Sequence, residues 1–367
     1  LLWQQLQISQ PTLRGELTSG HLGQGWTFRH LDYRSSLLDV QADELHLKWQ
    51  LGALLSGRLL IDEVQLDKGR IQIHPLADPL PEPEPEELLD TESTDQLIQL
   101  PFGIELKRLL VRDFVLTTPD VRVAVGRLQA AAQWQGSRLR LEQADGADVD
   151  VALLPSPKSS ATKKETAAPP LTKPFDANVV QQQIELLPKV FLPVSLEVEQ
   201  FKVQRARYHQ TGFDTGLFDV QARVGFEGVE LRVAQLLVWH PWGELRLKGQ
   251  MTFQDYYPMQ FELQGLSKMP WLDKQLVGRQ ARLNVAGPLT DLQTKLVVEG
   301  TEGLVMKARL NTLAPDLPFE TEAQWQTLQW PLKAAEYALT KGALRASGRL
   351  SDYRASLRSQ VKVQGLP

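Results

Sequence analysis

The side chains of this 367-residue chain that could perform catalysis or bind metal ions do not form recognisable motifs. It has no cysteine, so thiolate catalysis, cysteine-ligated metals and disulfides have no residues to form them. Its six histidines are dispersed along the sequence, and no two of them have the spacing of a metal-ligand pair. These histidines are His21, His30, His46, His74, His209 and His240. We therefore expect no metal site.

Motifs of the common enzyme classes are also missing. The stretch Gly20–Gly25 approaches a phosphate-binding loop, but Phe28 stands where the last glycine belongs and no helix is expected to follow, so a turn is the better interpretation. There is no nucleophile elbow and no Walker signature, and the carboxylates lie on charged strand faces without evident pairing. Asp255, Asp291 and Asp352 each follow a strand end, which is typical of turn residues. We expect no catalytic residue, no cofactor and no enzymatic activity.

Charge and composition exclude another class of function. The formal net charge is −4, and lysine and arginine are scattered singly, so the basic patch that binds nucleic acid is absent. The 42% hydrophobic content is enough for a sizeable core, yet no apolar run approaches the roughly 20 residues of a membrane helix. We expect no nucleic-acid partner, and a soluble chain that is a fragment of a longer protein.

The most regular stretch of the sequence is an alternating run from Gly243 to Phe253. Apolar residues occupy every second position and polar residues the positions between, which predicts a strand with one apolar face. The apolar set is Leu245, Leu247, Met251 and Phe253, and the polar set is Arg246, Lys248 and Gln250. Related runs recur at 283–289 and 342–350. A repeated unit that cannot bury its own apolar face indicates an assembly of stacked units.

Changes in composition divide the chain into five segments. Prolines interleaved with glutamates mark an acidic linker at 77–99, and prolines among serine, threonine and lysine mark a second linker at 154–178. We therefore expect an N-terminal β unit at 1–76, a β repeat unit at 100–153, and continuous β-groove repeats at 179–367.

Two stretches predict short helices. Leucines at helical spacing before Gly57 predict a helical turn at 50–57 that closes one end of the sheet, and Pro270 begins a second predicted helix within 269–276. Nothing resembles the longer helices that connect parallel strands. The sequence therefore predicts an all-β fold, an elongated and mostly antiparallel curved sheet made of consecutive hairpins.

The apolar face of this sheet is the candidate functional site. In a closed sandwich two such faces cover each other, whereas in a single curved sheet the face lines an open hydrophobic groove; the unbroken repetition favours the groove. The residues predicted to line it are Leu245, Leu247, Met251, Phe253, Phe261, Leu263, Leu283, Val285, Leu296, Val298, Leu304, Met306 and Leu310.

Several stretches, in their joint order, resemble the TamB family, the inner-membrane subunit of the bacterial translocation and assembly module. The stretches that carry the resemblance are Leu217–Ala222, Trp242–Gly249, Asp255–Pro258, Leu328–Pro331 and Gly342–Tyr353. The stretch from Trp49 to Leu59 is similar to the wider AsmA-like group. The resemblance covers nearly the whole chain.

The resemblance implies a taco-shaped β-groove (β-taco) in the periplasm. It further implies that one N-terminal helix anchors the protein in the inner membrane and that an outer-membrane barrel, TamA, is its partner. We expect this anchor helix and the family's C-terminal domain to be absent from this chain. The function that it implies is passage of phospholipid acyl chains between the two membranes, together with assembly of autotransporters and other outer-membrane proteins. A different class of function remains open: a scaffold whose sheet edge templates the strands of client barrels.

Overall fold

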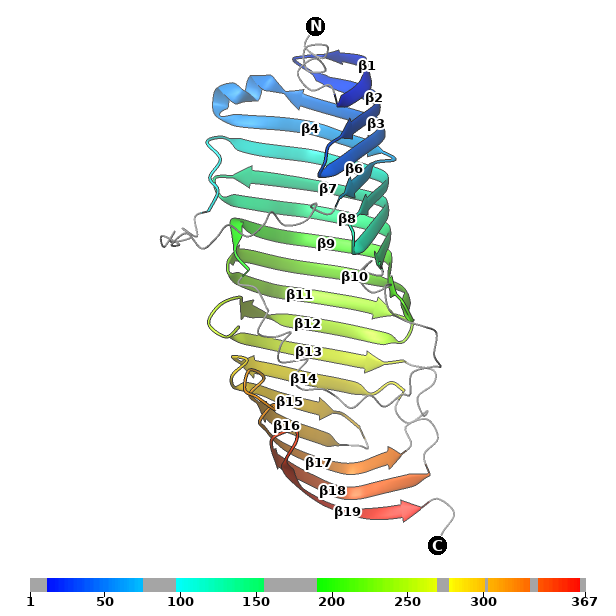
Figure 1. The fold of residues 1–367 in the computed structure, drawn as a ribbon, viewed down its shortest axis with the longest axis vertical. Coiled ribbons are helices and arrows are strands. Elements are labelled where there is room, and N and C mark those ends of the chain that lie inside the picture. Colours follow the sequence, from blue (N-terminus) through cyan, green and yellow to red (C-terminus); the bar gives the residue numbers. More distant parts are fainter. Residues whose placement is uncertain are drawn as a thin grey trace. The chain divides into compact units, whose positions relative to one another are not determined.

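The computed structural model describes residues 12–74, 97–154, 190–268, 277–300, 303–330 and 336–363. Nineteen strands belong to one sheet, and the described residues contain a single helix, which is short and of the 3-10 type (Figure 1). The predicted all-β, mostly antiparallel sheet is therefore confirmed. The chain divides into two compact units: unit 1 comprises Leu1–Thr166 and Pro193–Gln221, and unit 2 comprises Ala167–Leu192 and Ala222–Pro367.

Unit 1 contains the first nine strands and the helix. In chain order they are β1 (Leu13–His21), β2 (Gly25–Arg34), β3 (Leu38–Gln50), η1 (Leu51–Ser56), β4 (Arg58–Asp67), β5 (Arg70–Ile73), β6 (Gly103–Thr117), β7 (Val121–Gln135), β8 (Arg138–Leu153) and β9 (Leu192–Gln210). Strand β10 (Phe213–Gly228) begins in unit 1 and ends in unit 2.

The mostly antiparallel sheet contains parallel pairs at two places in unit 1, where consecutive hairpins were expected. Strand β6 runs parallel to its neighbours β4 and β5, and β9 runs parallel to β8. Apolar alternation cannot reveal this, because it looks the same in parallel and antiparallel pairs. Parallel neighbours need a long connection, and the two Pro-rich stretches of sequence fall in these two places. Most of both stretches, at 75–96 and 155–189, lies outside the described residues.

The short helix η1 lies where the sequence predicts a helical turn. It ends at Gly57, whose left-handed conformation lets its N–H donate to the carbonyl groups of Ala53 and Leu54. The expectation that it closes one end of the sheet is not met, because η1 has no buried residue. The second predicted helix, at 269–276, lies outside the described residues.

Strands bend at a common level in unit 1. Lys68, Asp113, Asp148 and Arg205 all have positive φ, between 49° and 57°. Lys68 lies between β4 and β5, and the other three lie at the same level on β6, β8 and β9. On β7, between Asp113 and Asp148, the corresponding residue is Gly126, where a Cβ atom would lie 2.9 Å from the Cβ of Asp148. Irregular residues of this kind bend a strand and increase its twist. The row therefore accounts for the curvature that Figure 1 shows in unit 1.

Unit 2 is a succession of antiparallel hairpins after the end of β10. Its further strands are β11 (Glu230–His240), β12 (Gly243–Thr252), β13 (Met259–Ser267), β14 (Gln280–Gly287), β15 (Leu292–Val298), β16 (Leu304–Leu310), β17 (Phe319–Trp330), β18 (Tyr337–Gly348) and β19 (Tyr353–Val363). The recurrent aspartates lie in turns, as predicted: Asp291 and Asp352 close the tips of β14–β15 and β18–β19, and Asp255 lies between β12 and β13.

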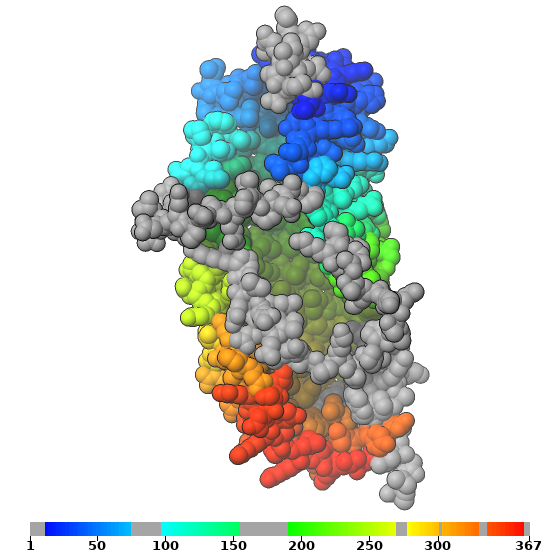
Figure 2. Space-filling view, viewed as in Figure 1, coloured from blue at the N-terminus to red at the C-terminus, as the bar shows by residue number. Residues whose placement is uncertain are grey.

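Little of either unit is fully buried. Buried apolar residues in the described parts are mostly alanine and valine, and none of the described large side chains is completely enclosed. The described elements contact one another as neighbours in the sheet, and η1 contacts β4. A domain normally buries its apolar faces between two layers. Within each unit the described strands form one layer, which agrees with the open sheet and not with the closed sandwich. In the space-filling view the green surface around β9 is recessed between raised rims (Figure 2).

Candidate functional site

A row of apolar side chains crosses nine strands of unit 2. Residues paired directly across neighbouring strands point to the same face of a sheet, so the register identifies the members of the row. We call it the central apolar row; its members are Leu236, Leu247, Leu263, Leu283, Leu296, Met306, Ala323, Leu344 and Leu357. Because neighbouring strands lie about 4.8 Å apart, the eight steps of this row span roughly 38 Å. One leaflet of a bilayer's hydrocarbon core is only about 15 Å thick.

Two further rows flank the central one on the same face. One of them contains Val238, Leu245, Gly265, Ala281, Val298 and Leu304. The other contains Val233, Gly249, Phe261, Val285, Thr294, Ala308, Thr321, Ala346 and Ala355. We call these three rows, with the apolar residues aligned beyond them, the apolar face. It carries no charged residue along the three rows, so nothing in them fixes a polar headgroup.

The structure brings the predicted groove residues together. Twelve of the thirteen lie in strands on the apolar face: Leu245, Leu247, Met251, Phe261, Leu263, Leu283, Val285, Leu296, Val298, Leu304, Met306 and Leu310. The thirteenth, Phe253, follows β12, and its ring stacks on Phe226 with centroids 5.7 Å apart and meets the edge of Tyr257 at 6.3 Å. Phe253 therefore belongs to an aromatic cluster at the tip of the hairpin.

These side chains are only half covered. Most are of intermediate exposure, Leu245 is exposed, and Leu357 at the β19 end of the central row is 61% exposed. A half-exposed apolar surface of this extent is typical of a binding site, which an acyl chain or another apolar partner can cover.

Sequence reasoning missed part of the apolar face. The central row continues through Ala323, Leu344 and Leu357, beyond the last predicted residue, Leu310. The signal was present, because apolar residues still alternate in β17 and β18. Unit 1 carries a row of its own, which the predicted set did not include: Phe28, Leu45, Leu66, Val111, Leu128, Gly146 and Val203. This row passes through both parallel junctions without losing its register.

The opposite face of unit 2 is charged. Lys248 pairs with Glu262 at 2.9 Å and Lys268 pairs with Glu244 at 2.6 Å. These hydrogen bonds hold the pKa values of the Glu262 and Glu244 carboxyls below their ordinary values. Exposed pairs of this kind contribute little to stability, because water and salt screen them. Their main effect is to keep this side of the single layer in water.

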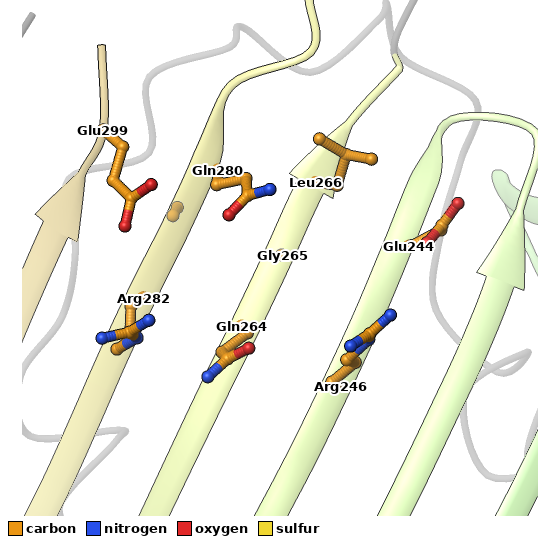
Figure 3. Close-up of a pocket in the computed structure, with 9 residues that line it drawn as sticks. Glu244, Arg246, Gln264, Gly265, Leu266, Gln280, Arg282 and Glu299 are labelled. Atoms are coloured by element: carbon orange, nitrogen blue, oxygen red, sulfur yellow. The ribbon is translucent and has the colours of Figure 1, made fainter.

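A hollow of about 130 Å³ lies on the charged side, at the ends of β12, β13 and β14 (Figure 3). Arg246, Gln264 and Arg282 stand side by side across the three strands and line it together with Glu244 and Glu299. None of the predicted groove residues lines this hollow. Gly265 and Ala281 of one flanking row also line the hollow, but its charged and amide side chains belong to the face opposite the predicted groove residues.

The described parts of the chain contain no candidate metal site. Histidine and carboxylate side chains do not gather there in a set able to hold a metal ion. Nor do the described residues form a helix long and apolar enough to cross a membrane.

Comparison with known proteins agrees with the architecture. No solved structure matches the chain significantly. A family model described as "TamB, N-terminal domain" matches residues 1–367, the whole chain. The chain thus belongs to the TamB family, whose members are non-enzymatic transport and assembly components of the cell envelope.

Proposed function

We propose that this chain carries phospholipid acyl chains along its apolar face in the periplasm, as part of the translocation and assembly module that bridges the inner and outer membranes. The observation that carries the proposal is the central apolar row, which is unbroken over nine strands and half exposed. The anchor in the inner membrane and the contact with the outer-membrane subunit TamA are then supplied by other parts of the protein.

The energetics suit a conduit better than a fixed binding site. Each methylene removed from water contributes about 0.8 kcal/mol, so an acyl chain is held firmly by any stretch of the apolar face. Successive strands along each row offer nearly equal contacts to an acyl chain, and the three rows contain no charged group to anchor a headgroup. A chain bound in this way can move along the face without losing contact.

Photo-crosslinking tests the proposal at neighbouring positions of one strand. Benzoylphenylalanine at Leu263, in the central row, is expected to capture phospholipid that is detected by mass spectrometry. The matched control is Gln264, one residue along β13 and on the charged face. Equal capture at both positions, or none at Leu263 in protein whose circular dichroism is unchanged, contradicts the proposal.

Charge substitution then separates binding from folding. Leu263→Asp and Leu283→Asp place a carboxylate in the central row and are expected to reduce retained lipid at least tenfold. Gln264→Asp serves as the control on the other face. Normal lipid retention by both central-row variants contradicts a role for the apolar face.

A scaffold that templates client strands is the second candidate. Strand β19 favours it, because β18 is its strand partner among the described residues and β19 exposes more than half of Tyr353, Leu357 and Val361. Such an edge can pair with an extended segment through backbone hydrogen bonds. On this alternative, proline at Leu357 stops assembly of client barrels while lipid capture at Leu263 continues. Loss of lipid capture with normal client assembly excludes it.

A further inference from the structure

Five chain segments lie together on the side of unit 1 where strands begin and end, and backbone and side-chain hydrogen bonds connect them. Trp49 Nε1 donates to the carbonyl of Leu22 at 2.7 Å, and Gly103 N–H donates to the carbonyl of Gly57 at 3.0 Å. Further along, the N–H of Leu100 reaches the carbonyl of Gly136, and that of Ile98 reaches the carbonyl of Pro193. We call this side the amphipathic rim; it comprises residues 20–26, 48–58, 98–103, 134–138 and 193–195.

The amphipathic rim exposes large apolar side chains that do not serve the core. Leu55 is 97% exposed and Leu54 is 44% exposed, and both belong to η1, which has no buried residue. Leu22 in the β1–β2 turn is 51% exposed, and Ile98 and Phe102 are also exposed. The cap at Gly57 fixes η1, so these leucines are presented by an ordered element (Figure 1).

The charge of the amphipathic rim is of one sign. Its five segments contain Lys48, Arg58 and Arg138 and no aspartate or glutamate. Asp62, beside the rim, accepts hydrogen bonds from Gln50 and from Lys107. At the opposite ends of the same strands both signs of charge are present, because Asp39, Asp120 and Asp214 lie at or beside turns together with Arg34 and Arg122.

We infer that the amphipathic rim is a membrane-contact surface that binds the anionic headgroups of a phospholipid bilayer and inserts Leu54 and Leu55 among them. Exposed leucines can insert at the boundary between headgroups and acyl chains, and the neighbouring cations can bind the negatively charged bilayer surface. A protein partner is favoured less, because the leucines project from a short helix and do not line a pocket. The inference stands apart from lipid carriage along the apolar face, since peripheral binding requires no transfer.

The lack of cysteine allows a site-specific test. An environment-sensitive dye on Leu55→Cys is expected to shift its emission to the blue when vesicles of phosphatidylglycerol and phosphatidylethanolamine are added. The matched control is Leu37→Cys, in the β2–β3 turn at the opposite ends of these strands and 51% exposed. No shift at Leu55, or an equal shift at Leu37, overturns the inference.

Vesicle sedimentation provides the second measurement. Leu54→Asp together with Leu55→Asp is expected to lower the bound fraction at least tenfold, because the exposed positions tolerate the change without unfolding. Arg58→Glu is expected to weaken binding to anionic vesicles, and vesicles of phosphatidylcholine alone bind poorly. Undiminished binding by the double variant, with an unchanged melting temperature, overturns the inference, and so does wild-type binding that is equal for both kinds of vesicle.

Discussion

Trp325 and Gly342 pack closely against each other across β17 and β18. They are direct cross-strand partners, Trp325 is only 8% exposed, and its Nε1 donates to the carbonyl of Leu339 at 3.1 Å. A Cβ atom on Gly342 would lie 1.9 Å from the indole ring. The glycine is therefore required because the indole occupies the space in which any other side chain would begin.

Substitution of Gly342 by alanine is expected to destabilise the protein by about 1–3 kcal/mol, since the indole must leave its position. Denaturant unfolding followed by tryptophan fluorescence measures the change. Gly52→Ala in η1 is the control, because a Cβ there meets nothing within 4 Å. A Gly342→Ala protein as stable as the Gly52→Ala protein contradicts this account.

Asp214, in unit 1, shows how hydrogen bonds shift the pKa of a single exposed carboxyl. The Arg207 guanidinium donates hydrogen bonds to its carboxylate, and the Gly216 N–H donates another at 2.8 Å. Together they lower the pKa of Asp214 to about 2. The stabilisation from this carboxylate is present above its unfolded pKa, near 3.8, and is lost as the pH falls through about 2.

Carboxyl chemical shifts measured across an acid titration are expected to place the midpoint of Asp214 near 2. In Arg207→Ala the midpoint should rise toward the ordinary value, because the largest cause of the shift is removed. Arg246→Ala, which has no contact with Asp214, should leave it unchanged. A midpoint near 4 in the wild-type protein contradicts the pairing.

At the scale of elements, the long strands of unit 1 carry a signal that a simple reading of alternation overlooks. Apolar residues in β6 form three spaced pairs, Ile104 and Leu106, Leu109 and Val111, and Phe114 and Leu116, with Leu110 and Val115 inside the last two pairs. The pairs are separated by two steps of three residues. At the first, from Leu106 to Leu109, the pairing with β7 is irregular, and at the second the strand bends at Asp113. Phase slips in the alternation thus mark the irregular positions.

The hairpin tips of unit 2 form hydrogen bonds outside the strand ladder. The N–H of Leu289 donates to the carbonyl of Tyr256, and that of Thr312 donates to the carbonyl of Leu289, both at 2.8 Å. At the next tip, Leu350 donates to the carbonyl of Asp316, and Ser351 N–H donates to the Asp316 carboxylate at 3.0 Å. These bonds link alternate hairpins and help to fix their register.

Removal of the Asp316 carboxylate tests the importance of this second set of bonds. In Asp316→Asn the Ser351 amide is expected to remain protected, because the side-chain oxygen is kept, whereas in Asp316→Ala its hydrogen exchange should accelerate at least tenfold. The amide of Leu344 in the middle of β18 is the internal reference and should not change. Equal exchange at Ser351 in both variants contradicts the proposed link.

For the whole chain, the sequence predicts the fold class and the members of the apolar face better than it predicts connectivity. Alternation depends on local chemistry, so Leu263, Leu283 and Leu296 could be assigned to one face without any knowledge of their partners. The parallel pairing of β8 with β9 could not, because it is decided by pairing between residues far apart in the sequence, such as Gly146 with Val203. The exposed leucines of η1 were also missed, since their helical spacing is equally typical of a buried plug.

The single layer of described strands leads to a last prediction about stability. A ligand that binds only the folded state stabilises it by RT ln(1 + [L]/Kd), which is about 2.7 kcal/mol at a hundredfold excess over Kd. Lysophosphatidylethanolamine, kept below its critical micelle concentration, is therefore expected to raise the melting temperature of delipidated protein progressively. Glycerophosphoethanolamine has the same headgroup and no acyl chain, so it should have no effect. If both compounds shift the melting temperature equally, headgroup contacts and not the apolar face account for binding; if neither does, the face is covered by the protein itself.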